Sequence, residues 1–379
     1  LWVFVLSVVV SISAMQAAYI LALVAWLLSL SLYGSEGRVR LPLAVPVCGF
    51  IVASCLASLT AIAPFRSLVE LRHVFEITVF YLAINTIPST ARATTLLRVL
   101  IAVGTLMALY GLGQSLAYGA AFRIQGTMSS YMTYAAQLML IGSLALAQLL
   151  FNRPSWHTRW LVPALLLLVA ALVMTHTRNA WLGFAAACLV LLGLRRPVLL
   201  LAVPVLALMA FLLAPPAVKG RMQSLVNLQD VTVQERLYMW RSGLRILRDY
   251  PFTGIGMGAM PQMYRRYRDA RDPTDPNRQL GHLHNNFVQV AAERGLIGLV
   301  WWMALWVTYF VHAWRAYKSL GQRAGPAKAL VAGSLASVTG FLVAGCFEHN
   351  FGDAEVITLT YFLMAFPFLI PEIPEARGV

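Results

Sequence analysis

Residues 284–311 read HNNFVQVAAERGLIGLVWWMALWVTYFV, a histidine at the start of a long apolar run. As a helix, a run of this length crosses the roughly 30 Å hydrocarbon core of a bilayer. His284 is therefore expected at a membrane surface, where a titratable side chain is costly and functional by default. Eleven Lys and Arg residues lie just before it, in segment 215–283. This pattern indicates a site for an anionic ligand.

The chain of 379 residues is 59% hydrophobic and only 12% charged, with a mean hydropathy of +0.71. Soluble domains contain roughly 25% charged residues, so we expect an all-α, polytopic membrane protein. Apolar runs predict about twelve spans, at residues 1–14, 16–33, 41–62, 68–87, 96–118, 130–151, 159–175, 178–194, 197–214, 284–311, 328–347 and 355–371. Because Leu1 lies inside an apolar run, the natural start is expected further upstream.

Positive charge predicts the orientation, because Lys and Arg in short loops stay in the cytoplasm. With the N-terminus inside, the cytoplasmic segments hold thirteen positive residues and the opposite short loops hold four. Segment 215–283 is too long for this rule and lacks a membrane-crossing apolar stretch. We therefore expect a transmembrane bundle of about nine spans over 1–214, a large external loop with short helices over 215–283, and about three spans over 284–379.

Several function classes are disfavoured by the sequence. The net charge of +14 comes without an aromatic-interleaved basic module, so no nucleic-acid partner is expected. The four cysteines fall in predicted spans without metal-ligand spacing. The glycine-rich stretch 254–258, GIGMG, follows no predicted strand. It is therefore expected to form a closely packed turn, not a dinucleotide-binding loop.

An amphipathic helix is predicted over 233–249, within the large loop. Its apolar stripe is Leu237, Trp240, Leu244 and Leu247, at helical spacing. Arginines border this stripe, at positions 236, 241, 245 and 248. They are either snorkelling interfacial anchors or ligand-binding groups.

Residues 264–278, YRRYRDARDPTDPNR, are expected to form a mobile, solvated flap over the membrane surface. The flap contains Arg265 and Arg266, two further candidates for substrate binding. Asp272 and Asp275 could hold a divalent cation, although no further ligands are evident. We therefore expect no metal site.

Four candidates for chemistry lie on the predicted outer side: Arg123, Arg178, Arg236 and His284. One arginine there is as well explained by an interfacial anchor, but several around a histidine suggest a diphosphate clamp. The planar guanidinium makes bidentate bonds to phosphate and keeps its charge. A neutral imidazole could take a proton from a sugar hydroxyl.

Neighbouring residues are assigned supporting roles. Asn285 could cap the following helix and fix the approach of the histidine. Gly295 and Gly298 are expected to allow close helix packing beneath the site. His282 and His349 are weaker candidates, the second near Glu348 and Asp353.

The chain resembles the O-antigen ligase and polymerase superfamily of bacterial envelope enzymes. The resemblance rests on His-Asn-x9-Gly-x-x-Gly at 284–298 after the large loop, Arg-x3-Leu at 178–182, Glu235-Arg236 with Trp240, Phe122-Arg123 with Gly126, and the twelve-span layout. It implies a GT-C-like glycosyltransferase of the bacterial inner membrane, with its active site facing the periplasm. The implied reaction is an inverting, metal-independent transfer of glycan from undecaprenyl diphosphate, without a cofactor.

In the ligase branch of this superfamily, the acceptor is a sugar hydroxyl of lipid A-core, in lipopolysaccharide biosynthesis. The resemblance implies that His284 is the general base, that Arg178 and Arg236 bind the departing diphosphate, and that Arg123 assists. The predicted substrate-binding set also includes Arg241, Arg265, Arg266, His282 and Asn285. The expected partners are the lipid-linked donor, lipid A-core and membrane lipids.

Alternatives remain open at this point. O-antigen polymerases and protein O-oligosaccharyltransferases share these elements, and the ligase is favoured because the chain is compact, with one large loop. From another class, a flippase or transporter of lipid-linked glycan would also suit a cationic cavity. A transporter should have broken helices or deep ionisable residues in both halves.

Overall fold

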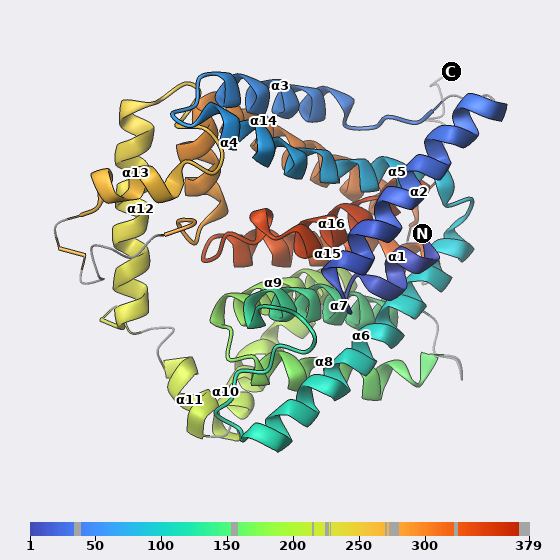
Figure 1. Ribbon diagram of the computed structural model, residues 1–379. Helices are drawn as coiled ribbons and strands as arrows, with labels where there is room; N and C mark the ends of the chain where they lie inside the picture. The colour runs from blue at the N-terminus through green and yellow to red at the C-terminus, as the bar shows by residue number, and fades with distance from the viewer. Residues whose placement is uncertain are drawn as a thin grey trace.

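The computed structural model describes residues 1–33, 39–152, 158–213, 216–223, 227, 229–269, 271–272, 280–321 and 325–370 (Figure 1). This part of the chain consists of helices and connecting loops and contains no strand. The predicted all-α class is confirmed.

The helices follow one another along the chain with short connections. The first part holds α1 (Trp2–Ser7), α2 (Ile12–Tyr33), α3 (Ala44–Leu59), α4 (Pro64–Glu70), α5 (Thr78–Thr86), α6 (Thr90–Tyr118), α7 (Tyr131–Phe151), α8 (Leu161–Met174), α9 (Arg178–Arg195) and α10 (Val203–Leu213). The second part holds α11 (Pro216–Gln223), α12 (Val231–Asp249), α13 (Met260–Tyr267), α14 (Asn286–Ser319), α15 (Pro326–Gly345) and α16 (Ala354–Met364). The described residues also contain the 3-10 helices η1 (Leu71–Ile77), η3 (Pro197–Ala202), η4 (Asn350–Gly352) and, after α16, η5 (Phe366–Leu369).

Five of the described helices, α2, α6, α7, α14 and α15, are long and apolar enough to cross a membrane. Shorter apolar helices lie at 44–59, 161–174 and 354–369. These helices fit a polytopic membrane protein. The number of twelve spans and the external location of 215–283 stay predictions.

Several predicted spans are not single continuous helices, among them 1–14, 68–87 and 197–214. In the first, α1 ends at Ser7 and α2 already begins at Ile12. The Ser11 hydroxyl accepts a hydrogen bond from the Ala14 N–H, so it caps the start of α2. The predicted span 68–87 is divided among α4, η1 and α5.

α15 lies at the centre of the bundle and packs against α7 and α9. In the apolar stretches of α7 and α15, 83% and 78% of the residues are buried, against 11% in α2. At the crossing of α9 with α15, a Cβ on Gly183 would lie only 2.6 Å from the carbonyl oxygen of Gly340. Small residues permit such close approach between membrane helices, while α2 lies at the periphery and is available to lipid.

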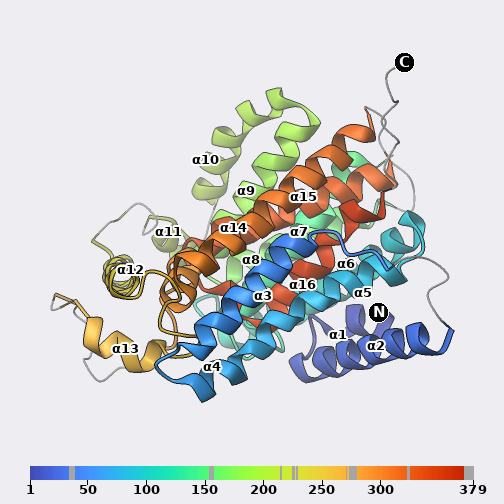
Figure 2. The same ribbon diagram turned by 90° about the horizontal axis from the view of Figure 1, so that it is seen from above.

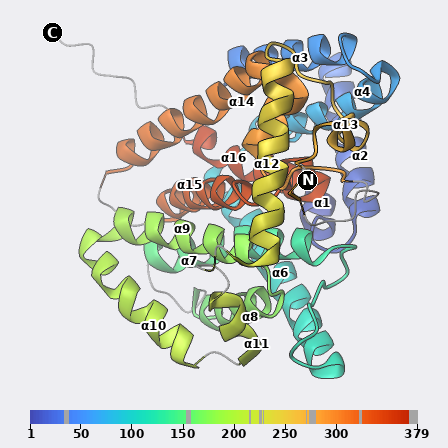
Figure 3. The ribbon, with the colours of Figure 1, turned by 90° about the vertical axis from the view of Figure 1, so that its left-hand side faces the viewer.

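α12 lies across one end of the bundle (Figures 1 and 3) and is seen nearly along its axis in Figure 2. Its residues include the predicted amphipathic helix 233–249, but the face that α12 buries is not the predicted apolar stripe. Its buried residues are Met239, Ser242, Gly243 and Ile246, whereas Leu244 of the predicted stripe is 55% exposed. The reason is steric: a Cβ on Gly243 would lie 2.5 Å from Val288 and 2.6 Å from Leu283, so α14 begins directly against this glycine.

The longest helix, α14, is interrupted at Gly295, where φ is 63° and ψ is −169°. Glycine is the residue that adopts this φ readily. The carbonyl oxygen of Phe252 occupies the space beside it, since a Cβ at position 295 would lie 2.1 Å from that oxygen. The predicted close packing at Gly295 therefore involves a loop instead of a second helix.

The loop 251–256 supplies hydrogen bonds that the interruption removes from α14. The Leu296 N–H donates to the Pro251 carbonyl at 2.7 Å, and the N–H groups of Ile255 and Gly256 donate at 3.0 Å to the carbonyls of residues 292 and 293. Buried backbone groups need such partners. The glycine-rich stretch is thus a closely packed turn, and it fixes the first part of α14 against the large loop.

Replacing Gly295 by alanine is expected to lower the free energy of unfolding by about 2 kcal/mol or more, because the new Cβ meets Phe252 and φ is unfavourable for it. Gly113→Ala is the matched control, since no atom lies within 4 Å of its added Cβ. It should change stability by less than about 1 kcal/mol. Thermal unfolding in detergent measures both, and equal effects would contradict this role for Gly295.

Candidate active site

His284 lies on the segment that leads from the large loop into α14. Its φ is 50°, in the left-handed region, which costs a non-glycine residue about 1–2 kcal/mol and is retained when the surroundings fix it. Asn285 provides part of that fixation. Its side-chain oxygen accepts from the Val288 N–H at 3.0 Å and caps α14, and its amide donates to the Cys346 carbonyl at 2.8 Å.

A second anchor joins the start of α14 to the turn between α15 and α16. The Asn286 amide donates to the side-chain oxygen of Asn350 at 2.5 Å. The Asn286 oxygen accepts from the Phe351 N–H at 3.1 Å and lies 3.2 Å from Nδ1 of His349. These bonds bring Glu348 beside His284, although the two residues are far apart in the sequence.

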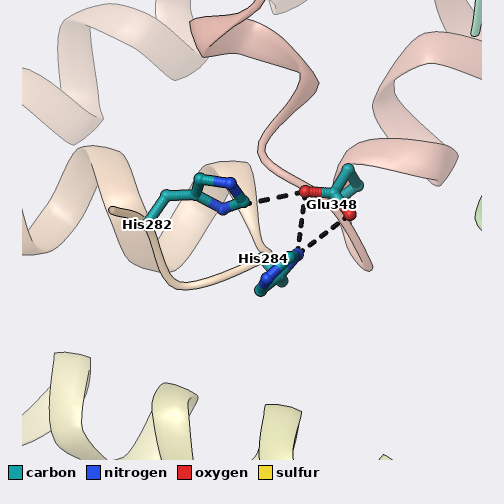
Figure 4. A group of neighbouring side chains, drawn as sticks. All are labelled: His282, His284 and Glu348. Carbon is teal, nitrogen blue, oxygen red and sulfur yellow. Dashed lines mark hydrogen bonds and ion pairs between the residues drawn. The ribbon is translucent and has the colours of Figure 1, made fainter. Parts of the chain in front are cut away.

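The Glu348 carboxylate is the centre of the candidate site (Figure 4). It is only 4% exposed. Both of its oxygens lie 2.9 Å from Nδ1 of His284. Nδ1 of His282 lies 3.7 Å from Oε1, and Nη2 of Arg236 lies 3.6 Å from Oε2. A histidine of the loop and an arginine of α12 therefore meet at one buried carboxylate.

The electrostatics of this cluster favour a charged carboxylate. Burial alone would raise the pKa of Glu348, but the hydrogen bond with His284 and the positive potential of neighbouring groups, Arg236 among them, lower it to about 2. Burial lowers the pKa of His282; the charge of Glu348 opposes this shift, and the nearby His284 and Arg236 add to it. Burial lowers the pKa of His349 to about 3. Glu348 is therefore the anionic member of the cluster, and His282 and His349 are neutral at physiological pH.

A cavity of about 230 Å³ adjoins His284. The charged residues of its lining are Arg123, Arg178, Arg221, Arg236 and Glu235. The structure thus gathers His284, Arg123, Arg178 and Arg236 at one place. Arginines dominate this charged lining, as an anionic ligand requires.

Arg178 is the first residue of α9 and is only 9% exposed. A positive charge at a helix N-terminus is unfavourable, because the helix dipole already places partial positive charge there. The preceding Thr177 does not cap α9 with its side chain. The guanidinium and the N–H groups of the first turn therefore create a positive potential in the cavity.

Two arginines also organise the walls of this cavity. Nη2 of Arg178 lies 3.3 Å from Oδ1 of Asp230, the residue that caps α12, so it ties α9 to α12. Arg123 stacks 3.4 Å above the ring of Tyr131. It also donates to the carbonyls of Thr175 and His176 at 3.2 and 3.1 Å. Arg123 thus fixes the turn that leads to Arg178.

Other predicted site residues lie elsewhere. Arg241 faces the ring of Tyr238 and is exposed, as are Arg265 and Arg266 on α13. These three arginines do not line the cavity beside His284. Their proposed contact with substrate stays a prediction.

The predicted solvated flap is only partly confirmed among the described residues 264–269 and 271–272, because Arg265, Arg266 and Arg271 are exposed but two carboxylates are buried. Asp269 is 3% exposed and pairs with Arg245 and Arg271. Asp272 is 6% exposed and accepts from Tyr264 at 2.8 Å and Arg268 at 3.0 Å. These bonds hold the two carboxylates in the interior. Asp275, the other aspartate named for a divalent cation, lies outside the described residues.

The sequence interpretation missed Glu348 as the partner of His284 and Arg221 as a wall of the cavity. Glu348 was noted only as a neighbour of His349, since pairing across distant segments leaves no periodic signal in one sequence. One usable sign was its position as an acidic residue directly after an apolar span. Such a residue needs a positive partner nearby.

Among the described residues, His282, His284 and Glu348 form a group that could hold a metal ion, with ligand atoms within 4.8 Å of one another. Imidazole nitrogens and a carboxylate oxygen are ligands typical of zinc. The guanidinium of Arg236 beside Glu348 opposes a second cation at this place.

Residues 163–303 match a family model described as O-antigen ligase. The matched segment contains Arg178, Arg236 and His284, while Arg123 and Glu348 lie outside it. The match confirms the resemblance to the O-antigen ligase and polymerase superfamily. It supports a glycosyltransferase role in lipopolysaccharide biosynthesis and a multi-pass membrane location. No curated protein matches the chain.

Asp353, which follows η4, gives this region a pH dependence. Burial and the charges of Glu348 and Glu355 raise its pKa to about 7 from 3.8. The folded state therefore binds a proton that the unfolded state has lost, and this contribution to stability is full below pH 4 and is lost as pH rises through 7. At about 1.36 kcal/mol per pKa unit, the loss is at most about 4 kcal/mol.

Asp353→Asn removes this titration. The wild type should lose stability relative to the variant between pH 4.5 and pH 8, as measured by thermal unfolding in lipid nanodiscs. The comparison cancels the titration of His349 and Glu348, which both proteins share. A constant difference across that range would contradict the raised pKa.

Proposed function

We propose that the protein is an O-antigen ligase of the bacterial inner membrane. It transfers glycan from undecaprenyl diphosphate to a sugar hydroxyl of lipid A-core on the periplasmic side, with His284 as general base. The observation that carries the proposal is the buried Glu348–His284 pair beside an arginine-lined cavity. The family match over 163–303 supports the same reaction class.

The contact with Glu348 determines which nitrogen of His284 can act as the base. A carboxylate at 2.9 Å from Nδ1 accepts the proton of that nitrogen, which leaves the lone pair on Nε2. Nε2 takes the proton as the acceptor hydroxyl oxygen attacks the anomeric carbon. Glu348 then stabilises the imidazolium that forms, as the buried carboxylate does in other histidine-based sites.

The arginines assist the breaking of the bond between the anomeric carbon and the diphosphate oxygen. As the bond from the anomeric carbon to the diphosphate oxygen breaks, its electron pair stays on the diphosphate. Arg178 and Arg236 then neutralise the growing charge, and Arg123 and Arg221 line the same cavity. Fixed guanidinium groups in a poorly hydrated cavity stabilise such charge strongly, and no step requires a metal ion.

The interruption of α14 at Gly295 does not favour a transporter. Loop 251–256 fills it with backbone hydrogen bonds, and the adjacent Glu293 and Arg294 pair with each other at 3.2 Å. The first half of the chain also contains a divided span, 68–87, so a broken helix alone does not distinguish a transporter from a transferase. The arginines beside His284 instead lie at the ends of spans or in the large loop, and not deep within spans of both halves.

The decisive assay is reconstitution with lipid-linked glycan and three acceptors: lipid A-core, a second lipid-linked glycan, and a pilin-like protein. We expect transfer to lipid A-core that persists with excess chelator and falls about 10²- to 10⁴-fold in His284→Ala. Size-exclusion profiles and retained donor binding show that the variant is folded. Product on the second glycan would identify a polymerase, and product on the pilin would identify a protein oligosaccharyltransferase. Transfer at the wild-type rate by His284→Ala would show that His284 is not the general base.

Replacing Arg236 by alanine should weaken binding of the diphosphate donor, because a partly buried guanidinium of the cavity is lost. Arg236→Lys should restore little, because an ammonium lacks the bidentate fork. Arg248→Ala is the matched control, since Arg248 lies exposed on the same helix. Donor affinity measured by intrinsic tryptophan fluorescence tests this, and equal effects at 236 and 248 would return Arg236 to an anchoring role.

A further inference from the structure

A second and larger cavity, of about 660 Å³, has Glu348 in its wall and is separate from the arginine-lined cavity beside His284. Its wall is made by the start of α2, by η1, by the residues before α7 and by the turn that leads into α16. Its volume is within the range of roughly 300–1,000 Å³ found for small-molecule sites. Glu348 and His282 form part of its wall, so it reaches the cluster around His284.

The two cavities adjoin at Met132, whose side chain lines both. Methionine is unbranched and flexible and can change rotamer within a packed wall. Because Met132 lines both cavities and Glu348 in the wall of the larger one bonds His284 beside the smaller one, a molecule in the larger cavity would lie near the proposed base. This is the arrangement that two substrates need when they react at a common boundary.

The charges of the two cavities are opposite. The larger cavity is lined by four carboxyl groups, from Glu76, Glu348, Asp353 and Glu355. Its basic lining consists of Arg72, which is exposed, and the imidazoles of His73 and His282. Phosphate groups would be repelled here and attracted to the arginines of the smaller cavity.

Polar groups available for a ligand are also present. Oε2 of Glu76 is buried and has no hydrogen-bond partner, although Oε1 lies 2.9 Å from Nδ1 of His73. Hydroxyl groups line the same wall, from Ser129, Ser130, Thr133, Thr358 and Tyr19. A buried carboxylate oxygen without a donor is costly, and the hydroxyl of a sugar would satisfy it.

We propose that this acidic cavity binds the acceptor saccharide, and that it selects an uncharged or amine-bearing sugar over a phosphorylated or acidic one. The identity of the occupant as the acceptor rests on the glycosyl transfer proposed above. The carboxyl groups accept hydrogen bonds from sugar hydroxyls and exclude anionic sugars by repulsion, a specificity that uses attraction and rejection together.

The test measures saccharide binding without turnover. His284→Ala protein in lipid nanodiscs is titrated calorimetrically at pH 8, above the pKa of about 7 of Asp353. The two probes are a dephosphorylated core oligosaccharide and the same oligosaccharide with its phosphates. We expect the dephosphorylated probe to bind about tenfold or more tightly than the phosphorylated one.

Glu76→Gln combined with Glu355→Gln should reduce this preference at least about threefold, because two charges are removed while the side-chain shapes are kept. Met132→Trp should weaken binding by filling the shared wall. Arg248→Ala in the same His284→Ala background is the control and should change nothing. Equal or tighter binding of the phosphorylated probe, an unchanged preference in the double variant, or no binding of either probe would overturn the inference.

The outcome is separable from that of the proposed function. Selective binding of the dephosphorylated probe together with absent transfer by the wild type would leave the saccharide site standing and remove the ligase. Transfer by the wild type without this selectivity would do the reverse.

Discussion

Burial of the Glu348 carboxylate is the constraint on which the arrangement of the site depends. A buried charge is tolerated only with partners of opposite charge and hydrogen bonds. Glu348 obtains them from His284 before α14 and from Arg236 on α12, two elements that the chain reaches through the large loop. Each partner has a second task in the proposed reaction, the histidine as base and the arginine beside the diphosphate. The contacts that stabilise the buried carboxylate therefore also bring the proposed base and the diphosphate-binding arginine together.

The backbone around this carboxylate is fixed by unusual local structure. Gly295 interrupts α14 and receives the loop 251–256, while Asn286 bonds to the turn that follows α15. Hydrogen bonds to backbone groups thus hold three segments that hydrophobic packing alone would leave free to slide. The His284 backbone, with its positive φ, is retained because both of its flanks are anchored. A rigid support of this kind is what a general base requires to keep its geometry.

Composition and apolar runs predict an all-helical membrane protein, and the predicted topology together with the family resemblance groups His284, Arg178, Arg236 and Arg123 at one site. The misses have physical reasons. α12 buries the face that contains Gly243, because a glycine without a side chain leaves room for the start of α14. A hydropathy pattern does not register this space, so it points to a different face. The flap was judged by its charges, yet Asp269 and Asp272 pair with neighbouring arginines and turn inward. Glu348 and the acidic cavity depend on contacts between distant segments, which a single sequence does not display.

The central claim is that Glu348 holds the proton on Nδ1 of His284 and leaves Nε2 free to act as the base. Nitrogen-15 NMR of protein labelled at histidine, with His284→Gln used to assign the signal, reports the tautomer directly. At pH 8, Nδ1 of His284 is expected to carry the proton and Nε2 is not, and Glu348→Gln is expected to remove this preference. A proton found on Nε2 in the wild type, or a tautomer unaffected by Glu348→Gln, would contradict it.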